Sequence, residues 1–373
     1  MNFFKKLKIY IEVKYIKKYI DNKYWKLADE THEKITTVFT KNHIELIHLF
    51  YPDTDLKKIE KEEHDVYLFR MRNFTQYIYK VRNAIVEPQL QWTILSNKEV
   101  FLYSFPYIED PWNSIIPRPS LISYKLPRKV TKIDKAVLIK FLWNNYYHFL
   151  NDIYGQLSLL EDRGIPYDIP LLVPHNYNRS GYVKAYLELF PLKRKIIVQQ
   201  PGEYYQVKEL YISKENACGP FIEKLSHQAE TVNDKISNTV APTAHKIFVT
   251  RNRKYTRTAL NIEELEQYAR DKGFLVIEPG DFTLLQQIKI FRNAKKIAGI
   301  HSAGLSNIAF CPKGQIELFE IFPGGGWHPE HYVNICKQLG FTHTSIEGNG
   351  LNSEKLFHVD FEQFKNHIDN LIK

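Results

Sequence analysis

The chain has 373 residues, of which 44% are hydrophobic and 25% are charged. This composition is that of an ordinary globular protein, and it excludes a disordered or fibrous chain. At roughly 100–200 residues per domain, the length predicts two domains. The 51 Lys and Arg residues exceed the 42 Asp and Glu residues, which gives a net charge of +9 and allows an anionic partner.

The three cysteines, Cys218, Cys311 and Cys336, are odd in number and far apart in the sequence. They exclude a disulfide framework and a Cys-x-x-Cys metal site. The sequence has no apolar run of about 18–20 residues and no small-residue cleavage site near its N-terminus. We therefore expect a cytoplasmic protein.

Most of the positive charge lies at the N-terminus, where eight lysines and two acidic residues within residues 1–27 contribute +6. Apolar residues recur there at helical spacing, which predicts a basic amphipathic helix within residues 1–30. Such a helix is typical of peripheral contact with an anionic membrane, here the inner membrane face. It is equally typical of a helix that packs on its own domain, and both interpretations stay open.

Residues 31–240 are expected to form a first Rossmann-like domain. Its early part has a mixed pattern, which prolines between Pro106 and Pro119 interrupt. A regular alternation follows, with predicted strands at 136–143, 169–173, 195–198 and 207–212 and predicted helices at 147–160, 182–189 and 222–236. The small and polar residues 237–245 predict a linker.

Residues 241–355 are expected to form a second Rossmann-like domain, and residues 356–373 a closing helix. The predicted strands are 246–250, 274–277, 296–300 and 316–321, and the predicted helices are 262–272, 283–293, 303–310 and 330–339. This alternation predicts a parallel sheet covered on both faces. The fold class is therefore α/β, with two Rossmann-like domains facing a central cleft. Ligands of such sheets bind beyond the carboxyl ends of the strands.

Two segments at predicted strand ends could hold an anion. Four cations, which include Arg251 and Arg257, follow the strand at 246–250 and precede a helix start at Asn261. Residues 301–307 follow the strand at 296–300, where Ser302 and Gly304 allow close backbone approach and His301 adds a donor. A solvated basic loop and a tight turn around a core histidine are the alternatives.

Two further places carry candidate residues. His148 and Asp152 follow the strand at 136–143 and are four residues apart, which suits a base and its orienting partner or a simple surface contact. Glu320 is a single carboxylate in an apolar strand, where a ribose diol or a salt bridge would satisfy it. His328 and His331 lack a third ligand for zinc, and we interpret their segment as a loop entering a helix.

In this order, these segments resemble glycosyltransferase family 61, in particular its bacterial capsular polysaccharide-type members. The family's aromatic-aromatic-His-aromatic-Leu-x-Asp run is matched by residues 146–152. Its strand ending in Ser/Thr-Arg, followed by basic residues and an Asn-x-x-Glu helix start, is matched by residues 250–264. Its Phe-x-x-Gln segment and His-Gly-Ala-Gly-Leu-Thr-Asn run are matched by residues 282–287 and 301–307, with Ser302 and Ser306 as departures.

The resemblance implies a GT-B architecture in which the C-terminal domain holds most of a nucleotide sugar. It also implies inversion at the anomeric carbon with no essential metal and no cofactor. The sequence agrees with the expected absence of a metal, since no Asp-x-Asp-type pair follows a predicted strand. The expected partners are a nucleotide sugar and a glycan or glycolipid acceptor. Nucleic acid is not expected, because no known nucleic-acid motif occurs.

The resulting hypothesis is an inverting glycosyltransferase of bacterial surface polysaccharide synthesis with a UDP-linked donor. Asp152 is the expected base, with His148 as a competing base or an orienting partner. The expected donor contacts are Arg251, Arg257, His301, Ser302 and Gly304 for the diphosphate, and Ser306, Asn307 and Glu320 for the ribose or base. The alternatives are a nucleotide-sugar epimerase on the same scaffold and a non-catalytic glycan- or membrane-binding module.

Overall fold

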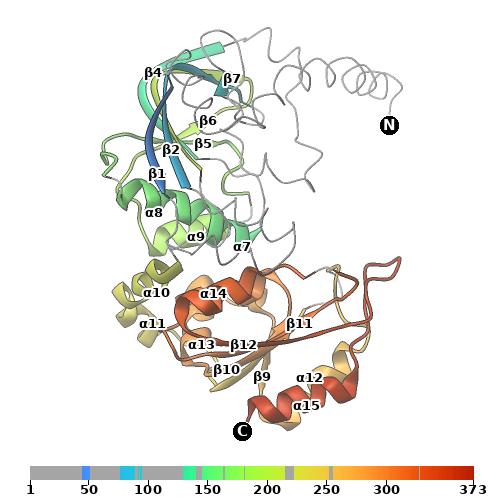
Figure 1. The fold of residues 1–373 in the computed structure, drawn as a ribbon. Coiled ribbons are helices and arrows are strands. Elements are labelled where there is room, and N and C mark those ends of the chain that lie inside the picture. Colours follow the sequence, from blue (N-terminus) through green and yellow to red (C-terminus); the bar gives the residue numbers. More distant parts are fainter. Residues whose placement is uncertain are drawn as a thin grey trace. The chain divides into compact units, whose positions relative to one another are not determined.

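A computed structural model describes most of the chain from residue 129 onward and four shorter stretches before it (Figure 1). The described residues are 44–50, 76–88, 91, 93–94, 129–139, 145–162, 164–179, 181–214, 222–251, 255–326 and 328–373. The predicted basic helix at residues 1–30 lies outside them. No helix within the described ranges has the length and apolar character needed to cross a bilayer.

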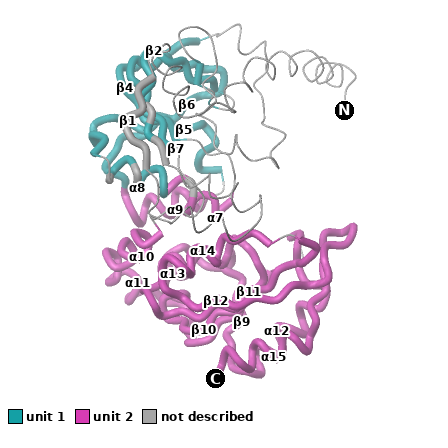
Figure 2. Tube along the Cα trace, viewed as in Figure 1, with its two compact units in different colours: residues 1–142, 155–179, 192–217 teal, residues 143–154, 180–191, 218–373 magenta. Residues whose placement is uncertain are grey.

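The chain divides into two compact units, which are distinguished in Figure 2. Unit 1 comprises residues 1–142, 155–179 and 192–217, and unit 2 comprises residues 143–154, 180–191 and 218–373. Residues 143–154 and 180–191 therefore cluster with the C-terminal part of the chain. The two units are defined by contacts in space and not by order along the chain. The four-part domain division expected from the sequence stays a prediction.

Unit 1 contains a mixed sheet whose strands run in the order β1-β2-β7-β4-β5-β6, with β3 paired to β2. β1, β2 and β7 pair antiparallel, whereas β7, β4, β5 and β6 pair parallel. The strands are β1 (Ile44–Phe50), β2 (Gln76–Val86), β3 (Thr93–Ile94), β4 (Lys129–Leu138), β5 (Leu171–Pro174), β6 (Ile196–Gln199) and β7 (Glu203–Lys214). Helix α8 (Tyr154–Asp162) has all but its first residue in this unit.

Unit 2 contains a fully parallel sheet of five described strands in the order β12-β11-β10-β8-β9. The strands are β8 (Lys246–Val249), β9 (Leu275–Ile277), β10 (Lys296–Ile300), β11 (Glu317–Phe322) and β12 (Thr342–Glu347). The described residues thus form a mixed α/β fold with two sheets, as the sequence predicted at that level.

Helices cover both faces of the unit 2 sheet, as expected for parallel strands. α12 (Ile262–Asp271) and α15 (Phe361–Leu371) pack on one face around buried Phe248, Phe319 and Phe364. Figure 1 shows α13 (Leu284–Asn293) and α14 (His331–Leu339) on the other face. The remaining elements of the unit are α7 (Tyr146–His148), η3 (Phe149–Ile153), α9 (Tyr182–Leu189), α10 (Ile222–Thr231), α11 (Asn233–Asn238), η4 (Pro279–Asp281) and η5 (Ala303–Phe310).

The strand order identifies the place where a ligand would bind. From β8 the chain crosses to β9 on one side, and then returns to β10 and continues to β11 and β12 on the other side. The order therefore reverses between β8 and β10. In open α/β sheets, ligands bind at such a switch point beyond the carboxyl ends of the strands. The loops after Val249 and Ile300 meet there.

β8 and β10 approach each other closely where Gly299 of β10 lies beside Val249 of β8. A Cβ atom on Gly299 would lie 2.7 Å from the Val249 carbonyl oxygen and 2.8 Å from the Val249 Cβ. Only glycine fits there without a shift of the backbone. The glycine thus sets the spacing of the two strands whose loops form the switch point.

Several predicted elements differ in extent or type. β4 begins at Lys129 rather than at Ala136, because its first half is a polar and partly exposed strand without an apolar signal. The predicted helix 147–160 is a short α-turn, a π-helical turn and then α8, and residues 303–310 form a 3₁₀ rather than an α-helix. β12 was not predicted, since its alternating Thr, His and Ser side chains resemble a polar loop.

Candidate functional site

Two arginines lie in the loop that follows β8. The Nε–H of Arg251 donates to the Thr256 carbonyl over 2.8 Å, and the guanidinium lies 5.5 Å from the Tyr255 ring centroid. Arg257 has a left-handed backbone with φ of +64°, and its N–H donates to the Lys355 carbonyl over 2.7 Å. This bond to the 348–358 segment holds the unusual backbone of Arg257 in place.

Both guanidinium groups are half-buried, and their positive charges lie close enough to interact. Burial lowers the pKa of Arg251, and the nearby charge of Arg257 lowers it further. Burial also lowers the pKa of Arg257. Each charged form is thus less favoured than in water, although both arginines stay protonated near neutral pH. An anion placed beside them would relieve this repulsion.

His301 follows β10 directly and is buried beside these arginines. Its backbone N–H donates to the Ile321 carbonyl over 2.9 Å, which fixes the first residue of the turn. Burial lowers the pKa of the His301 ring, the charges of Arg257 and Arg251 lower it further, and Glu320 opposes them. The neutral ring is therefore favoured when no other anion is present.

Glu320 lies behind His301 in β11, and its side chain is 0% exposed. One of its carboxylate oxygens, Oε1, bonds the Nδ1 atom of His301, and the other, Oε2, lies 2.8 Å from Nε2 of His343. Burial acts to raise the pKa of Glu320, but the hydrogen bonds from the two histidines outweigh it, and the pKa is lowered. Neither oxygen is exposed for the ribose contact expected from the sequence.

Ser302 and Ser306 are both buried and face Tyr332 of α14. The Tyr332 hydroxyl donates to the Ser302 carbonyl, and the Ser306 hydroxyl lies 3.3 Å from the Tyr332 hydroxyl. Burial raises the pKa of Tyr332, so its proton stays in place for this bond. Tyr332 therefore holds the His301 turn against α14, a role that the sequence did not suggest.

Asn307 joins three of the segments that match the family pattern, namely residues 146–152, 282–287 and 301–307. It is fully buried, and its Oδ1 atom accepts a hydrogen bond from the Tyr146 hydroxyl over 2.9 Å. Its Nδ2 atom donates to Gln287 Oε1 over 2.9 Å and to the Gly304 carbonyl over 3.0 Å. Gln287 in turn donates to the Phe282 carbonyl over 2.9 Å. These bonds use both ends of the Asn307 amide to hold the turn.

Gly304 lies inside this turn and has little free space around its Cα. An added Cβ would lie 2.9 Å from Cγ of Pro279 and 3.4 Å from Cγ1 of Val249. The turn therefore packs directly on η4 and on the last residue of β8. The close approach that the sequence suggested for Gly304 is made to protein atoms in this structure.

The His331 ring lies between His148 and the His301 turn, so that the three histidine rings form a row. Asn145 accepts the Tyr147 N–H over 2.8 Å and so begins α7. The Tyr147 ring lies 4.2 Å from the His331 ring, and His331 lies 6.5 Å from His148 and 5.7 Å from His301, all between centroids. His331 was not predicted as a site residue. The backbone of residue 152 lies in η3, but the Asp152 side chain is outside the described part of the structure.

The histidines around His301 do not make a metal centre. Within the described ranges, no group of three or more His, Cys, Asp or Glu side chains is arranged to hold a metal ion. The metal-free and cofactor-free reaction expected from the sequence stays a prediction.

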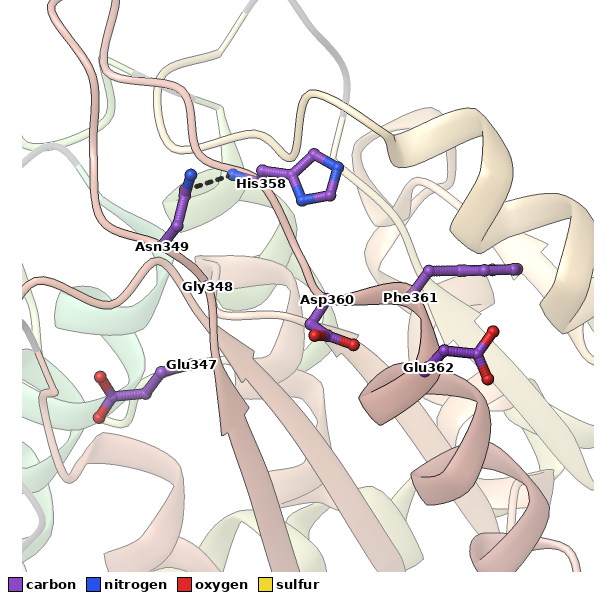
Figure 3. Close-up of a pocket in the computed structure, with 7 residues that line it drawn as sticks. All are labelled: Glu347, Gly348, Asn349, His358, Asp360, Phe361 and Glu362. Carbon is purple, nitrogen blue, oxygen red and sulfur yellow. Dashed lines mark hydrogen bonds between the residues drawn. The ribbon is translucent and has the colours of Figure 1, made fainter.

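A separate hollow of about 540 Å³ lies between the end of β12 and the start of α15 (Figure 3). It is lined by Glu347, Gly348, Asn349, His358, Asp360, Phe361 and Glu362, and the His358 N–H donates to Asn349 Oδ1 over 2.7 Å. Figure 3 shows the Glu347 carboxylate pointing away from Asp360 and Glu362. Because the acids do not converge and would repel an anion, we assign this hollow no ligand.

Residues 146–316 match the family model described as Glycosyltransferase 61. The matched range begins at Tyr146 and includes Arg251, Arg257 and the His301 turn. This match makes the chain a glycosyltransferase, an enzyme that generally uses a nucleotide-sugar donor and a glycan acceptor. The enzyme class expected from the sequence is confirmed at this level.

No curated protein sequence matches the chain. Among solved structures, the chain is similar to the bacterial iron-containing dodecameric glycosyltransferase TibC from enterotoxigenic E. coli H10407. The identity is 13%, the TM-score is 0.31, and the alignment covers 65% of this chain and 76% of that one. This likeness is too distant to support a statement about the present chain.

Proposed function

We propose that this glycosyltransferase is an inverting, metal-independent enzyme with the GT-B architecture. It transfers a sugar from a UDP-linked donor to a hydroxyl group of a glycan or glycolipid acceptor. The process we propose is bacterial surface polysaccharide synthesis, such as capsule formation, at the inner face of the membrane. The charge pattern of residues 1–30 supports peripheral contact with that membrane.

The main support for this proposal is that Arg251, Arg257 and His301 lie close together. Two half-buried guanidinium groups and a buried imidazole adjoin the switch point of a parallel sheet, where nucleotides bind in such folds. Transfer leaves a nucleoside diphosphate, whose negative charge grows as the glycosidic bond breaks. Arginines and a histidine held in place before the reaction stabilise that charge.

The neighbouring residues take roles that follow from their burial. Ser302 and Gly304 belong to the turn that follows His301, and we propose that the backbone of this turn faces the diphosphate. Ser306, Asn307 and Glu320 are buried behind it and hydrogen bond to protein atoms. We therefore assign these last three residues to holding the turn, in place of the ribose or base contact expected from the sequence.

The acceptor hydroxyl needs a general base, because inversion occurs in a single displacement. We propose Asp152 as this base and His148 as the competing base or as its orienting partner. The position of His148 in the row of rings that leads to His301 supports its nearness to the donor. Asp152→Asn should abolish transfer and leave donor binding intact. Near-normal turnover of Asp152→Asn would shift the role to His148.

A donor screen tests the function directly. The purified protein is mixed with UDP-, GDP-, ADP- and CDP-linked sugars, with and without extracted cell-envelope glycans, and the released nucleotide is measured. We expect UDP release that increases when the glycans are present. Formation of an altered nucleotide sugar without any acceptor would contradict transfer and indicate an epimerase. An absence of nucleotide-sugar binding would contradict an enzyme of either kind.

A further inference from the structure

A buried chain of three side chains runs across the edge of the unit 2 sheet. It consists of His343 on β12, Glu320 on β11 and His301 after β10. Nε2 of His343 lies 2.8 Å from Oε2 of Glu320, and Nδ1 of His301 bonds Oε1. The side chain of His343 is 13% exposed, while those of Glu320 and His301 are 0% and 5% exposed.

A buried carboxylate is costly unless its oxygens are hydrogen bonded, and here a histidine meets each oxygen. The carboxylate accepts, so the His301 proton is at Nδ1 and the added proton of a charged ring would be at Nε2. Glu320 therefore fixes the tautomer of His301 and can stabilise its charged form.

Several other groups face His301. Arg251 and Arg257 on the β8 loop disfavour a positive ring. Two rings of α14 lie near the His301 ring, Tyr332 at 5.2 Å and His331 at 5.7 Å between centroids. The Phe322 ring of β11 stacks on the His301 ring at 5.2 Å between centroids. Cys336 of α14 also faces Glu320. Of these groups, the two arginines oppose the charged ring most directly, and they are the groups that a diphosphate would neutralise.

We propose that donor binding is coupled to uptake of one proton by His301, and that His343 is the positioning residue that makes this possible by holding Glu320. The inference rests on the proposed diphosphate site. Before binding, His301 is neutral with its proton at Nδ1. When the diphosphate reaches Arg251 and Arg257, Nε2 takes a proton from the solvent and donates it in a hydrogen bond to a phosphate oxygen. Glu320 balances the new charge from the other side.

His343 acts on this step only through Glu320. If its N–H is lost, Oε2 of Glu320 becomes a buried oxygen without that donor, and the carboxylate is destabilised relative to its protonated form. A protonated Glu320 carries no charge to stabilise a positive His301. The ring would then stay neutral in the complex, and one charge-assisted hydrogen bond to the phosphate would be lost.

Calorimetric titration of the full chain with UDP at pH 7.5, in buffers of different ionisation enthalpy, counts the protons taken up. We expect close to one proton for the wild type and less than half of that for His343→Phe, with affinity lowered about tenfold. His343→Gln, which keeps an N–H donor, should recover most of the uptake. His227→Gln is the control, since His227 is exposed and bonds a carbonyl of its own helix.

The outcomes separate this inference from the proposed function. Tight binding of UDP by the wild type without proton uptake would overturn the inference and leave the diphosphate site intact. Failure to bind UDP, other nucleoside diphosphates or inorganic pyrophosphate would overturn both. If His343→Phe does not fold, nitrogen-15 NMR of the wild-type His301 ring decides, since a proton at Nε2 must appear on UDP binding.

Discussion

Removal of one hydroxyl group tests whether the buried amide of Asn307 holds the His301 turn. Tyr146→Phe deletes the donor to Asn307 Oδ1 and leaves the ring in place. Burial raises the pKa of Tyr146, so the wild-type hydroxyl stays a donor at all accessible pH values. Because the amide is fully buried, its oxygen finds no replacement donor in water.

The expected loss of unfolding free energy follows from the number of hydrogen bonds that each variant removes. One unmade bond to a buried amide costs about 1–2 kcal/mol of unfolding free energy. Asn307→Ala removes three bonds and leaves the Tyr146 hydroxyl and the Gly304 carbonyl without their partner, which should cost roughly 3–5 kcal/mol. The double variant should lose less than the sum, by about 1 kcal/mol, because the two residues share one bond.

Urea denaturation followed by circular dichroism measures these losses, and UDP titration measures their effect on the site. Tyr146→Phe should weaken UDP binding as well, since the bond anchors the turn that carries His301. Tyr167→Phe is the matched control, because Tyr167 is 42% exposed and should change stability by less than about 0.5 kcal/mol. Unchanged stability and unchanged UDP affinity of Tyr146→Phe would refute the anchoring role of Asn307.

Three further predictions concern the same unit. Arg251→Ala should raise the dissociation constant for UDP at least tenfold in a titration, on the order expected for a charged phosphate contact, whereas the exposed Arg270→Ala should not change it. Gly299→Ala should lower the melting temperature and weaken UDP binding together, at a cost of about 1–3 kcal/mol, because the new Cβ would push β10 from Val249. Because burial lowers the pKa of His301, its neutral form contributes stability that is complete above the ordinary histidine pKa of about 6.5 and is lost as pH falls below it. Melting curves between pH 7.5 and 5 should therefore show a pH slope that His301→Asn reduces; an equal slope in both proteins would contradict this origin.

Local pattern was sufficient for much of unit 2. The apolar alternation predicted α9 over Tyr182–Leu189 and β10 over Lys296–Ile300 with the bounds that the structure has. The predicted helix 283–293 corresponds to α13, which the Thr283 side chain caps together with Gln286. These elements are decided by neighbours in the sequence, so a reading of the sequence can find them.

The remaining features depend on residues far apart in the sequence. Glu320 was recognised as a carboxylate in need of a partner, but its partner His343 is on a strand whose polar alternation hid it. The bond between Tyr146 and Asn307 spans 161 residues, and no local pattern encodes it. The sequence pointed to residues 301–307 and Glu320 as candidates, and the structure adds that the side chains of Ser306, Asn307 and Glu320 hydrogen bond to protein atoms.

We propose above that Arg251, Arg257 and His301 form the site for the diphosphate of a nucleotide sugar. Its most direct test compares, by calorimetry, the binding of UDP with that of uridine to the wild type and to Arg251→Ala/Arg257→Ala. We expect the wild type to bind UDP about 100-fold more tightly than uridine, and the double variant to lose most of this difference. Equal affinity for UDP and uridine, or an unchanged preference in the double variant, would contradict it.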